Sequence, residues 1–335
     1  MKKGLVVFLT ALVLFSVAAS LSFAGGQGDK KGTTAAEKTV GAKKIGISLF
    51  YRRDEFYKDL ETGFIEGAKK HGFDVNIQDA DADPSKQMQQ IEDFIASKVN
   101  LIAFAAADPA GLVPAVKEAN KAGIPVITFD GSISGGADLV AFVGMDNYKA
   151  GVMAGTWAKD YIQKKLGGKA NVVILDFPQS AVVCGNRVKG FKETLKDMPD
   201  VKIIAQQDGK ASRTESMSVM ENILTANAKI DIVFGINDDT IFGGVAACEA
   251  AGRKDIVFVD VGWSQELFEK LKKDDPYVKA SAVQNPYLMG MGTMDAIKQY
   301  FDGKTIPKEI LQEPILTTKE NVDTLGWEEI VAKRK

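Results

Sequence analysis

The sequence predicts an α/β protein with two parallel β-sheets, each covered by helices on both faces. Short apolar runs of strand length alternate with longer segments whose apolar residues recur every three or four positions, as on one face of a helix. The apolar runs are continuous, which is typical of strands buried in a parallel sheet. The chain of 335 residues holds about ten such units, too many for one doubly wound sheet of ordinary size. Two sheets of five or six strands are therefore expected.

The regular pattern begins with KIGISLF at residues 44–50, a short apolar run that is expected as the first strand. A helix is expected over residues 55–72, because apolar side chains recur there every four residues and Gly72 follows them. The recurring side chains are Phe56, Leu60, Phe64 and Ala68.

The remainder of the first half repeats this alternation. Pro84 suits the first turn of a helix, and Gly123 suits the position just past the end of one. The expected strands are residues 74–79, 101–107 and 125–130. The expected helices are residues 84–98 and 109–122.

The second half continues with the same periodicities. The expected strands are residues 171–177, 201–207, 231–237, 255–262 and 278–284. The expected helices are residues 147–165, 184–196, 212–226, 239–251, 264–272 and 286–301. Ligands bind at the carboxyl ends of the strands in such sheets, so residues directly after strands are the candidates for a binding site.

The N-terminus has the features of a secretory signal peptide: a basic start, an apolar run and small residues before Gly25. We expect residues 1–24 to be removed and residues 25–43, which lack an apolar period, to form a flexible tether. An uncleaved membrane anchor is the alternative, although the apolar run is shorter than the roughly 20 residues that a span needs. No Cys lies near the expected cleavage site, so we expect a periplasmic or cell-envelope protein without a lipid anchor.

Composition argues against several classes of protein. The formal net charge of −2 gives no basic excess for binding nucleic acid. One His and two Cys leave little material for a metal cluster, and we expect neither metal nor cofactor. Phosphate-loop, dinucleotide and nucleophile-elbow motifs are absent, and the sole His71 is expected to be structural, so we expect no enzymatic activity. Cys184 and Cys248 are expected either to form a disulfide or to remain free buried thiols.

The turn after the first strand carries the densest group of candidate binding residues. Four aromatic residues and several polar ones follow one another between positions 50 and 57. Aromatic faces pack on the C–H patches of a sugar, while carboxylates bind its hydroxyl groups. The candidates in this turn are Phe50, Tyr51, Arg52, Asp54, Phe56 and Tyr57.

Polar or aromatic residues also follow four later strands. Asp130 ends VITFD and offers a carboxylate to adjacent hydroxyl groups. Asn237 ends DIVFGIN and both donates and accepts hydrogen bonds, while Asp238 or Asp239 is expected to cap the next helix. Trp is seldom mere filler at a strand end. The candidates at these strand ends are Asp130, Asn237, Trp263 and Gln284.

Taken in order, these motifs resemble a type I periplasmic substrate-binding protein, and most closely the ribose/galactose-type sugar-binding group of ABC importers. The motifs are KIGISLF, FYKDLETGFIEGAKKHG, IPVITFDG, MDNYKAG, VFGINDD and AVQNP, within residues 44–318. The resemblance implies two Rossmann-like lobes joined by three hinge crossings. It also implies closure of the lobes on a sugar and docking of the closed form on a permease in the inner membrane. We expect a monomer with no nucleic-acid partner.

The resemblance places the three crossings near Met145, near Gln284-Asn285 and near Glu313. The N-terminal lobe is then expected to comprise residues 44–145 plus 285–313, and the C-terminal lobe residues 146–284 plus 314–335.

Carried over residue by residue, the resemblance implies that Phe56 and Tyr57 stack on the sugar. It implies that Asp130, Asn237 and Gln284 bind the sugar hydroxyl groups. Asp54 stands where the family has an asparagine just before the stacking aromatics, which is a partial departure.

Three further departures concern the choice of sugar. Gly131 stands where ribose binders have an Arg, and the Arg of the second lobe falls near Gly185, with the candidate Arg187 close by. The family's acidic residue after another strand aligns with Gly262, and Trp263 beside it is expected to supply a second stacking face, as in hexose binders. Ribose itself is therefore not the expected ligand.

The leading hypothesis is a binding protein that captures a monosaccharide, polyol or sugar derivative and feeds an ABC importer. Arg52 and Arg53 leave a sugar acid or phosphorylated sugar open as the ligand. A sensory protein that presents its ligand to a chemotaxis or quorum-signal receptor is the main alternative. A sugar-responsive repressor is disfavoured because a signal peptide stands where its DNA-binding headpiece would be, and a glycosidase because no two carboxylates are paired in sequence.

Overall fold

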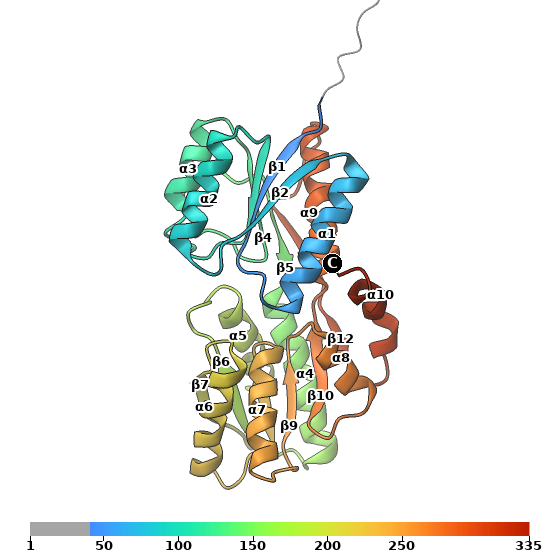
Figure 1. Ribbon diagram of the computed structural model, residues 1–335. Coiled ribbons are helices and arrows are strands. Elements are labelled where there is room, and N and C mark those ends of the chain that lie inside the picture. The colour runs from blue at the N-terminus through green and yellow to red at the C-terminus, as the bar shows by residue number, and fades with distance from the viewer. Residues whose placement is uncertain (1–40, 335) are drawn as a thin grey trace, which may run out of the picture. The chain divides into compact units, whose positions relative to one another are not determined.

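The computed structural model describes residues 41–334, whose strands form two six-stranded sheets (Figure 1). The first sheet consists of β1 (Lys44–Leu49), β2 (Asp74–Asp79), β3 (Leu101–Phe104), β4 (Val126–Phe129), β5 (Phe142–Met145) and β11 (Glu309–Gln312). Its order is β11-β5-β4-β3-β1-β2, and all neighbouring strands are parallel. Every residue of β3 and β4 is buried, as expected for central strands covered on both faces.

The second sheet has the same size and a similar plan. It consists of β6 (Ala170–Asp176), β7 (Val201–Asp208), β8 (Ile232–Gly235), β9 (Val257–Asp260), β10 (Val278–Val283) and β12 (Ile315–Thr317). Its order is β12-β10-β9-β8-β6-β7, and the edge strand β12 is its one antiparallel member.

Four helices belong to the first sheet: α1 (Glu55–His71), α2 (Pro84–Ala96), α3 (Val113–Lys121) and α9 (Pro286–Phe301). Helix α1 packs against α9, although more than 200 residues separate them in the chain. Their backbones approach so closely that a Cβ atom at Gly63 would lie 2.2 Å from the carbonyl oxygen of Tyr287. A Cβ atom at Gly290 would lie 2.4 Å from the carbonyl oxygen of Leu60, so glycine is required on both helices.

The remaining helices belong to the second sheet. They are α4 (Asn147–Lys165), α5 (Cys184–Leu195), α6 (Arg213–Ala226), α7 (Asp238–Ala250), α8 (Gln265–Lys272), the short 3₁₀-helix η1 (Val322–Leu325) and α10 (Trp327–Val331). Helix α4 packs against α5, and α6 packs against α7.

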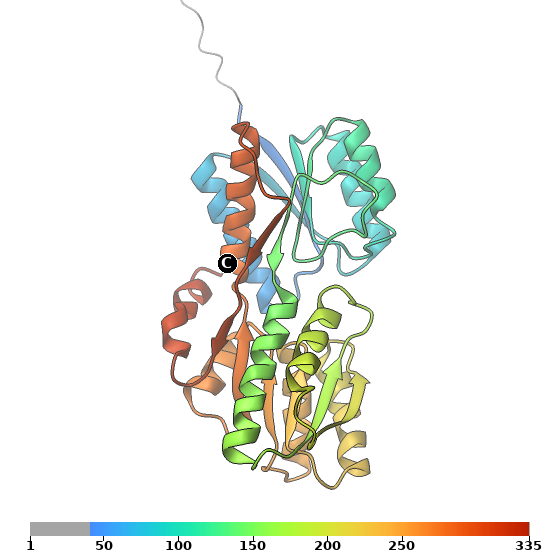
Figure 2. The ribbon, with the colours of Figure 1, turned by 180° about the vertical axis from the view of Figure 1, so that it is seen from behind.

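The chain passes between the two sheets three times. Strand β5 of the first sheet leads into α4, β10 of the second sheet leads into α9, and β11 of the first sheet leads into β12 of the second (Figure 2). We call the first sheet with α1, α2, α3 and α9 the first lobe, and the second sheet with its helices the second lobe. The carboxyl ends of β1 and β4 in the first lobe and of β8, β9 and β10 in the second lobe carry the residues discussed below.

The predicted fold class of two parallel sheets covered by helices is confirmed, and most predicted elements agree to within a few residues. Two boundaries were wrong: the strand expected at 101–107 ends at Phe104, and the helix expected at 109–122 begins only at Val113. The backbone turns between them because Asp108 accepts a hydrogen bond from Ala110 N at 2.9 Å.

Five short elements were not predicted: β5, β11, β12, η1 and α10. Strands β11 and β12 have exposed residues among their three or four positions, so neither shows an apolar run. Both pair at the edge of a sheet whose other strands come from distant parts of the chain, which no local pattern reveals.

The expected signal peptide and nearly all of the expected tether lie outside the described residues. Within residues 41–334, no helix combines the length and apolar character needed to cross a membrane. Cys184 and Cys248 are both buried and free, so the disulfide alternative is wrong. His71, at the end of α1, lies 2.5 Å from Asp295 of α9, in agreement with a structural role.

Candidate functional site

The first turn of α1 presents a carboxyl group at the carboxyl end of β1. Asp54 is the N-cap of α1, and its side chain accepts a hydrogen bond from Tyr57 N at 2.9 Å. Burial raises the pKa of Asp54 to about 6, even though the Tyr57 N–H favours its charged form. The carboxyl group is therefore fixed by the helix terminus and is partly buried.

Four aromatic rings pack around this turn. The ring centroids of Tyr51 and Tyr57 lie 4.9 Å apart, those of Phe50 and Tyr51 also 4.9 Å, and those of Phe56 and Tyr57 5.3 Å. Tyr57 is 4% exposed, and its hydroxyl group donates to Asp130 Oδ2 at 2.6 Å. Tyr57 was expected to be a stacking face. The hydrogen bond to Asp130 gives Tyr57 a second role, that of a donor which orients a carboxylate.

Asp130 directly follows β4 and is held by an unusual backbone. Its φ angle is +55°, in the left-handed region, and Phe129 and Gly131 form an isolated bridge around it. Aspartate tolerates this region better than most residues. Burial raises the pKa of Asp130, while the Tyr57 hydroxyl and the charge on Arg187 oppose that shift. The positive charge of Arg187, a second-lobe residue, thus acts on the carboxyl group of Asp130 in the first lobe.

Arg187 lies on α5 of the second lobe and is 4% exposed. Its guanidinium donates to Asn147 Oδ1 at 2.8 Å and to Ile236 O at 2.7 Å. Longer bonds of 3.4 Å reach Val261 O and Gln284 Oε1. These acceptors are amide or carbonyl oxygens, so they orient the cation without neutralising its charge. Arg187 thus joins the carboxyl ends of β8, β9 and β10.

Asn237 and Gln284 stand at two of these strand ends. Asn237 is the N-cap of α7: its Oδ1 accepts from Thr240 N at 3.0 Å, and Thr240 Oγ1 accepts from Asn237 N at 3.2 Å. The expectation that Asp238 or Asp239 caps this helix was therefore wrong, because the helix begins at Asp238. Gln284 is almost fully buried, with its Oε1 directed at Arg187.

The sequence reasoning missed a pair of buried carboxyl groups, Asp238 and Asp260. Oδ2 of Asp238 and both carboxyl oxygens of Asp260 have no hydrogen-bond partner among the described residues. A Cβ atom at Gly262 would lie 2.0 Å from Asp238 Oδ1 and 2.7 Å from Asp260 Oδ2, so the two groups flank the same point. The available signal was Asp260 itself, an acidic residue that ends the buried strand VFVD.

Both carboxyl groups of this pair have raised pKa values. Burial raises the pKa of Asp238 to about 7. Burial and the neighbouring charge of Asp238 raise the pKa of Asp260 well above its usual range. We call Asp54, Asp130, Asp238 and Asp260 the four site carboxyl groups.

The structure does not bring Arg52 into this cluster, which corrects its expected role. Its guanidinium donates to Glu61 Oε2 at 2.6 Å and Oε1 at 2.7 Å, and to Ile77 O at 3.1 Å. Arg53 lies over the ring of Tyr51, 4.3 Å from its centroid. The fork that a sugar acid or phosphate would need is therefore already occupied at Arg52.

Trp263 also differs from its expected role as a stacking face. Its ring is 3% exposed and packs edge-on against Phe268, with centroids 5.0 Å apart. Its indole N–H donates to Asp59 Oδ2 of the first lobe at 2.7 Å. Trp263 therefore connects the two lobes.

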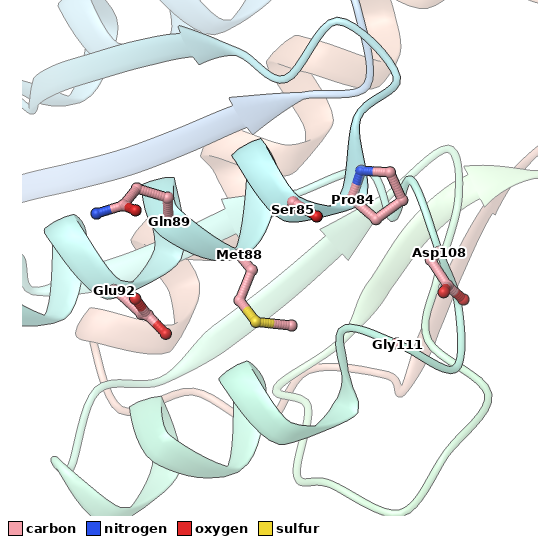
Figure 3. A pocket seen from close by; sticks show the side chains of 7 residues that line it. All are labelled: Pro84, Ser85, Met88, Gln89, Glu92, Asp108 and Gly111. Carbon is pink, nitrogen blue, oxygen red and sulfur yellow. The ribbon is translucent and has the colours of Figure 1, made fainter.

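A hollow of about 310 Å³ lies elsewhere, between α2 and the loop that precedes α3 (Figure 3). Its lining residues are Pro84, Ser85, Met88, Gln89, Glu92, Asp108 and Gly111. None of the four site carboxyl groups lines it, so it is not part of the candidate site.

Comparisons with known proteins identify the family. The family described as "Periplasmic binding protein domain" matches residues 45–305, nearly the whole of both lobes. The chain belongs to this family. The resemblance to type I periplasmic sugar-binding proteins of the ribose/galactose group is thereby confirmed.

Within this periplasmic binding protein family, the chain is similar to the ribose import binding protein of Bacillus subtilis. The two are 31% identical over 92% of this chain and 97% of the relative. The chain is 31% identical to the galactofuranose-binding protein of Escherichia coli, over 82% of this chain and 86% of the relative. A solute-binding protein of an ABC transporter from Bacillus halodurans C-125, crystallised with bound myo-inositol, matches with a TM-score of 0.77 and 27% identity. That match covers 88% of this chain and 98% of the other.

Proposed function

We propose that this protein is an extracytoplasmic solute-binding protein that captures a small sugar or polyol between its lobes and delivers it to an ABC importer. The observation that carries the proposal is the convergence of Asp130, held by Tyr57, on the oriented guanidinium of Arg187 from the other lobe. Relatives named for ribose and galactofuranose, and one solved with myo-inositol, support a polyhydroxylated ligand.

The residues supply the contacts that such a ligand requires. The carboxyl groups of Asp54, Asp130 and Asp260 accept hydrogen bonds from ligand hydroxyl groups, and Arg187 donates to ligand oxygens. Phe56 and the rings around it pack on C–H patches. Because Asp54 and Asp130 belong to the first lobe and Arg187 and Asp260 to the second, the ligand binds the closed arrangement best and shifts the population toward it.

We extend the proposal to the organisation of the protein. The lobes bend at the crossings near Met145, Gln284-Asn285 and Glu313, with lobe boundaries as the sequence predicts. The protein acts as a monomer, without catalysis or cofactor, and its closed form docks on a permease of the inner membrane. Support comes from the family, which is described as a periplasmic binding protein domain.

Native mass spectrometry of the purified protein tests the ligand class by the mass of whatever co-purifies. A thermal-shift panel of D-ribose, D-galactose, L-arabinose, D-allose, xylitol, myo-inositol, D-galacturonate and ribose 5-phosphate complements it. We expect a neutral sugar or polyol to raise Tm by several degrees. Stabilisation by none of them would remove the carbohydrate proposal.

The two acids in the panel test the conclusion that Arg52 binds Glu61 and does not belong to the binding site. We expect D-galacturonate and ribose 5-phosphate to be rejected, because the site has four carboxyl groups and Arg187 is the one cation that the described residues place among them. Binding of an acid but no neutral sugar would restore the sugar-acid hypothesis. Uptake of the bound sugar by a deletion strain distinguishes import from presentation to a sensory receptor.

A further inference from the structure

Asp59 of the first lobe has a fully buried carboxylate whose partners all belong to the second lobe. It lies one turn into α1 and is 0% exposed. Trp263 Nε1 donates to Oδ2 at 2.7 Å. Arg334 donates to Oδ1 through Nε at 2.6 Å and to Oδ2 through Nη2 at 2.7 Å. A buried carboxylate is costly without partners, so this one is satisfied only while the lobes touch here.

A second carboxylate on the same face of α1 strengthens the contact. Glu55 Oε2 accepts from Gln265 N at 2.7 Å and lies 2.9 Å from Arg334 Nη1. The planar fork of Arg334 therefore bridges Glu55 and Asp59, one helical turn apart. Bidentate, charge-assisted bonds of this kind are among the strongest hydrogen bonds in proteins.

The C-terminal segment that supplies Arg334 touches the first lobe at another point. Lys333 Nζ lies 3.3 Å from Glu66 of α1 and 3.2 Å from the hydroxyl of Tyr287. Tyr287 is in the first turn of α9, directly after the chain has crossed from β10. We call residues 327–334 the C-terminal strap, and Figure 1 shows α10 and the C-terminus beside α1.

The other end of the strap is anchored in the second lobe by aromatic packing. The rings of Trp327 and Phe268 have centroids 5.3 Å apart, and Phe268 packs edge-on against Trp263. Trp263 N also donates to Asp238 Oδ1 at 2.9 Å. The strap is thus connected through Phe268 to Trp263, whose backbone N–H binds Asp238, one of the four site carboxyl groups.

We propose that the C-terminal strap is a fourth, non-covalent connection between the lobes, which limits their opening and slows ligand release. Opening would separate Arg334 and Trp263 from Asp59, so the bonds favour the closed arrangement whatever the sugar is. Asp59 and Arg334 act here as positioning residues, because neither is placed among the ligand-binding side chains. The part of the proposal that concerns release rests on the proposed function.

The test compares wild type with Arg334→Ala, Trp263→Phe and Asp59→Asn. The matched control is Arg253→Ala, because Arg253 makes an equally bidentate pair with Asp255 within the second lobe. Small-angle X-ray scattering without added sugar reports lobe opening. Stopped-flow dissociation reports release, using whichever neutral panel sugar stabilises the wild-type protein most.

We expect Arg334→Ala to increase the radius of gyration and to raise the dissociation rate roughly tenfold, while Arg253→Ala matches wild type. The double variant Asp59→Asn/Arg334→Ala should release sugar little faster than Arg334→Ala alone, because both changes break one contact. The strap proposal would be overturned if Arg334→Ala had the same radius of gyration and the same release rate as the control Arg253→Ala. If no sugar binds the wild-type protein, the proposed function fails. The scattering measurement, made without sugar, still tests whether the strap limits opening of the lobes.

Discussion

The carboxyl groups of the two lobes differ in how they are satisfied. In the first lobe, Asp54 accepts from Tyr57 N and Asp130 accepts from the Tyr57 hydroxyl, so one tyrosine orients both. In the second lobe, Asp238 and Asp260 flank one point, and three of their four oxygens lack a partner among the described residues. The first-lobe group is an organised acceptor surface. The second-lobe pair is satisfied only when a proton or an outside donor is supplied.

This difference shows that carboxyl groups at the strand ends of the two sheets can have different environments and different roles. The first-lobe carboxyl groups gain their geometry from a helix cap and a left-handed residue, which are local features. In the second-lobe pair, the positive charge of Arg187 favours the ionised form of Asp260. Arg187 lies on α5, and oxygen atoms at three strand ends accept hydrogen bonds from its guanidinium.

The largest expected effect comes from removing the cation that faces both groups. Arg187→Met should lower the free energy of unfolding by about 3 kcal/mol, because Ile236 O and Asn147 Oδ1 lose their donor and the buried carboxyl groups lose a counter-charge. Affinity for the best-bound sugar should fall at least about 100-fold. Urea unfolding and calorimetric titration measure the two effects.

Arg253→Ala is the control for Arg187→Met, since it removes an arginine that pairs within the second lobe far from the strand ends. Equal losses of affinity in the two variants would contradict the role of Arg187 at the site.

The second prediction concerns pH and separates the two groups directly. The pKa of Asp238 in the folded protein, about 7, lies above that of an ordinary aspartate. Between about pH 4 and pH 7 the folded protein therefore holds a proton that the unfolded chain releases, so the free energy of unfolding falls as pH rises through this window. Urea unfolding from pH 5 to pH 8 should show this fall.

In Asp238→Asn, the free energy of unfolding should decrease less as pH rises. This variant should also be more stable than wild type at pH 8, because it removes one of two like charges. Asp54, with a pKa of about 6, should leave a smaller residual slope below pH 6. A pH profile in Asp238→Asn identical to wild type would contradict the coupled pair.

The third prediction tests the organisation of the first-lobe group. Tyr57→Phe keeps the ring but removes the hydroxyl that donates to Asp130. Affinity should fall roughly tenfold, and the free energy of unfolding by about 1 kcal/mol, as one charge-assisted bond is lost. Calorimetric titration of wild type, Tyr57→Phe and Phe50→Tyr measures the change in affinity. An unchanged affinity in Tyr57→Phe would show that Asp130 does not need the Tyr57 hydroxyl to orient it for binding.

The smallest effect is expected at Arg52. Arg52→Ala breaks the partly exposed ion pair with Glu61, so stability should change by less than about 1 kcal/mol. Sugar affinity should remain within about twofold of wild type, since the guanidinium is directed at Glu61 and Ile77. Titration of this variant beside Tyr57→Phe measures it, and a tenfold loss would return Arg52 to the binding site.

Local sequence alone predicted the fold class and most of its elements, but not the strands β5, β11 and β12. The period of apolar residues predicted the helices, and continuous apolar runs predicted buried parallel strands, because both signals depend on neighbours within a few residues. Topology then made strand ends the candidate site, and Asp130 and Gln284 do follow strands. Arg187 was named by the family resemblance instead, and its guanidinium reaches three strand ends from α5.

Only the tertiary structure decided the direction of each side chain. Arg52 binds Glu61 and Trp263 binds Asp59, and the second pair is separated by 204 positions in the chain. Asp238 and Asp260 can approach each other because Gly262 has no side chain between them. Arg334, the second partner of Asp59, lies 275 positions away in the chain. Hydrogen bonds and charge interactions act over a few ångströms in space, so a pattern along the chain names the candidates and the packing of distant segments assigns their partners.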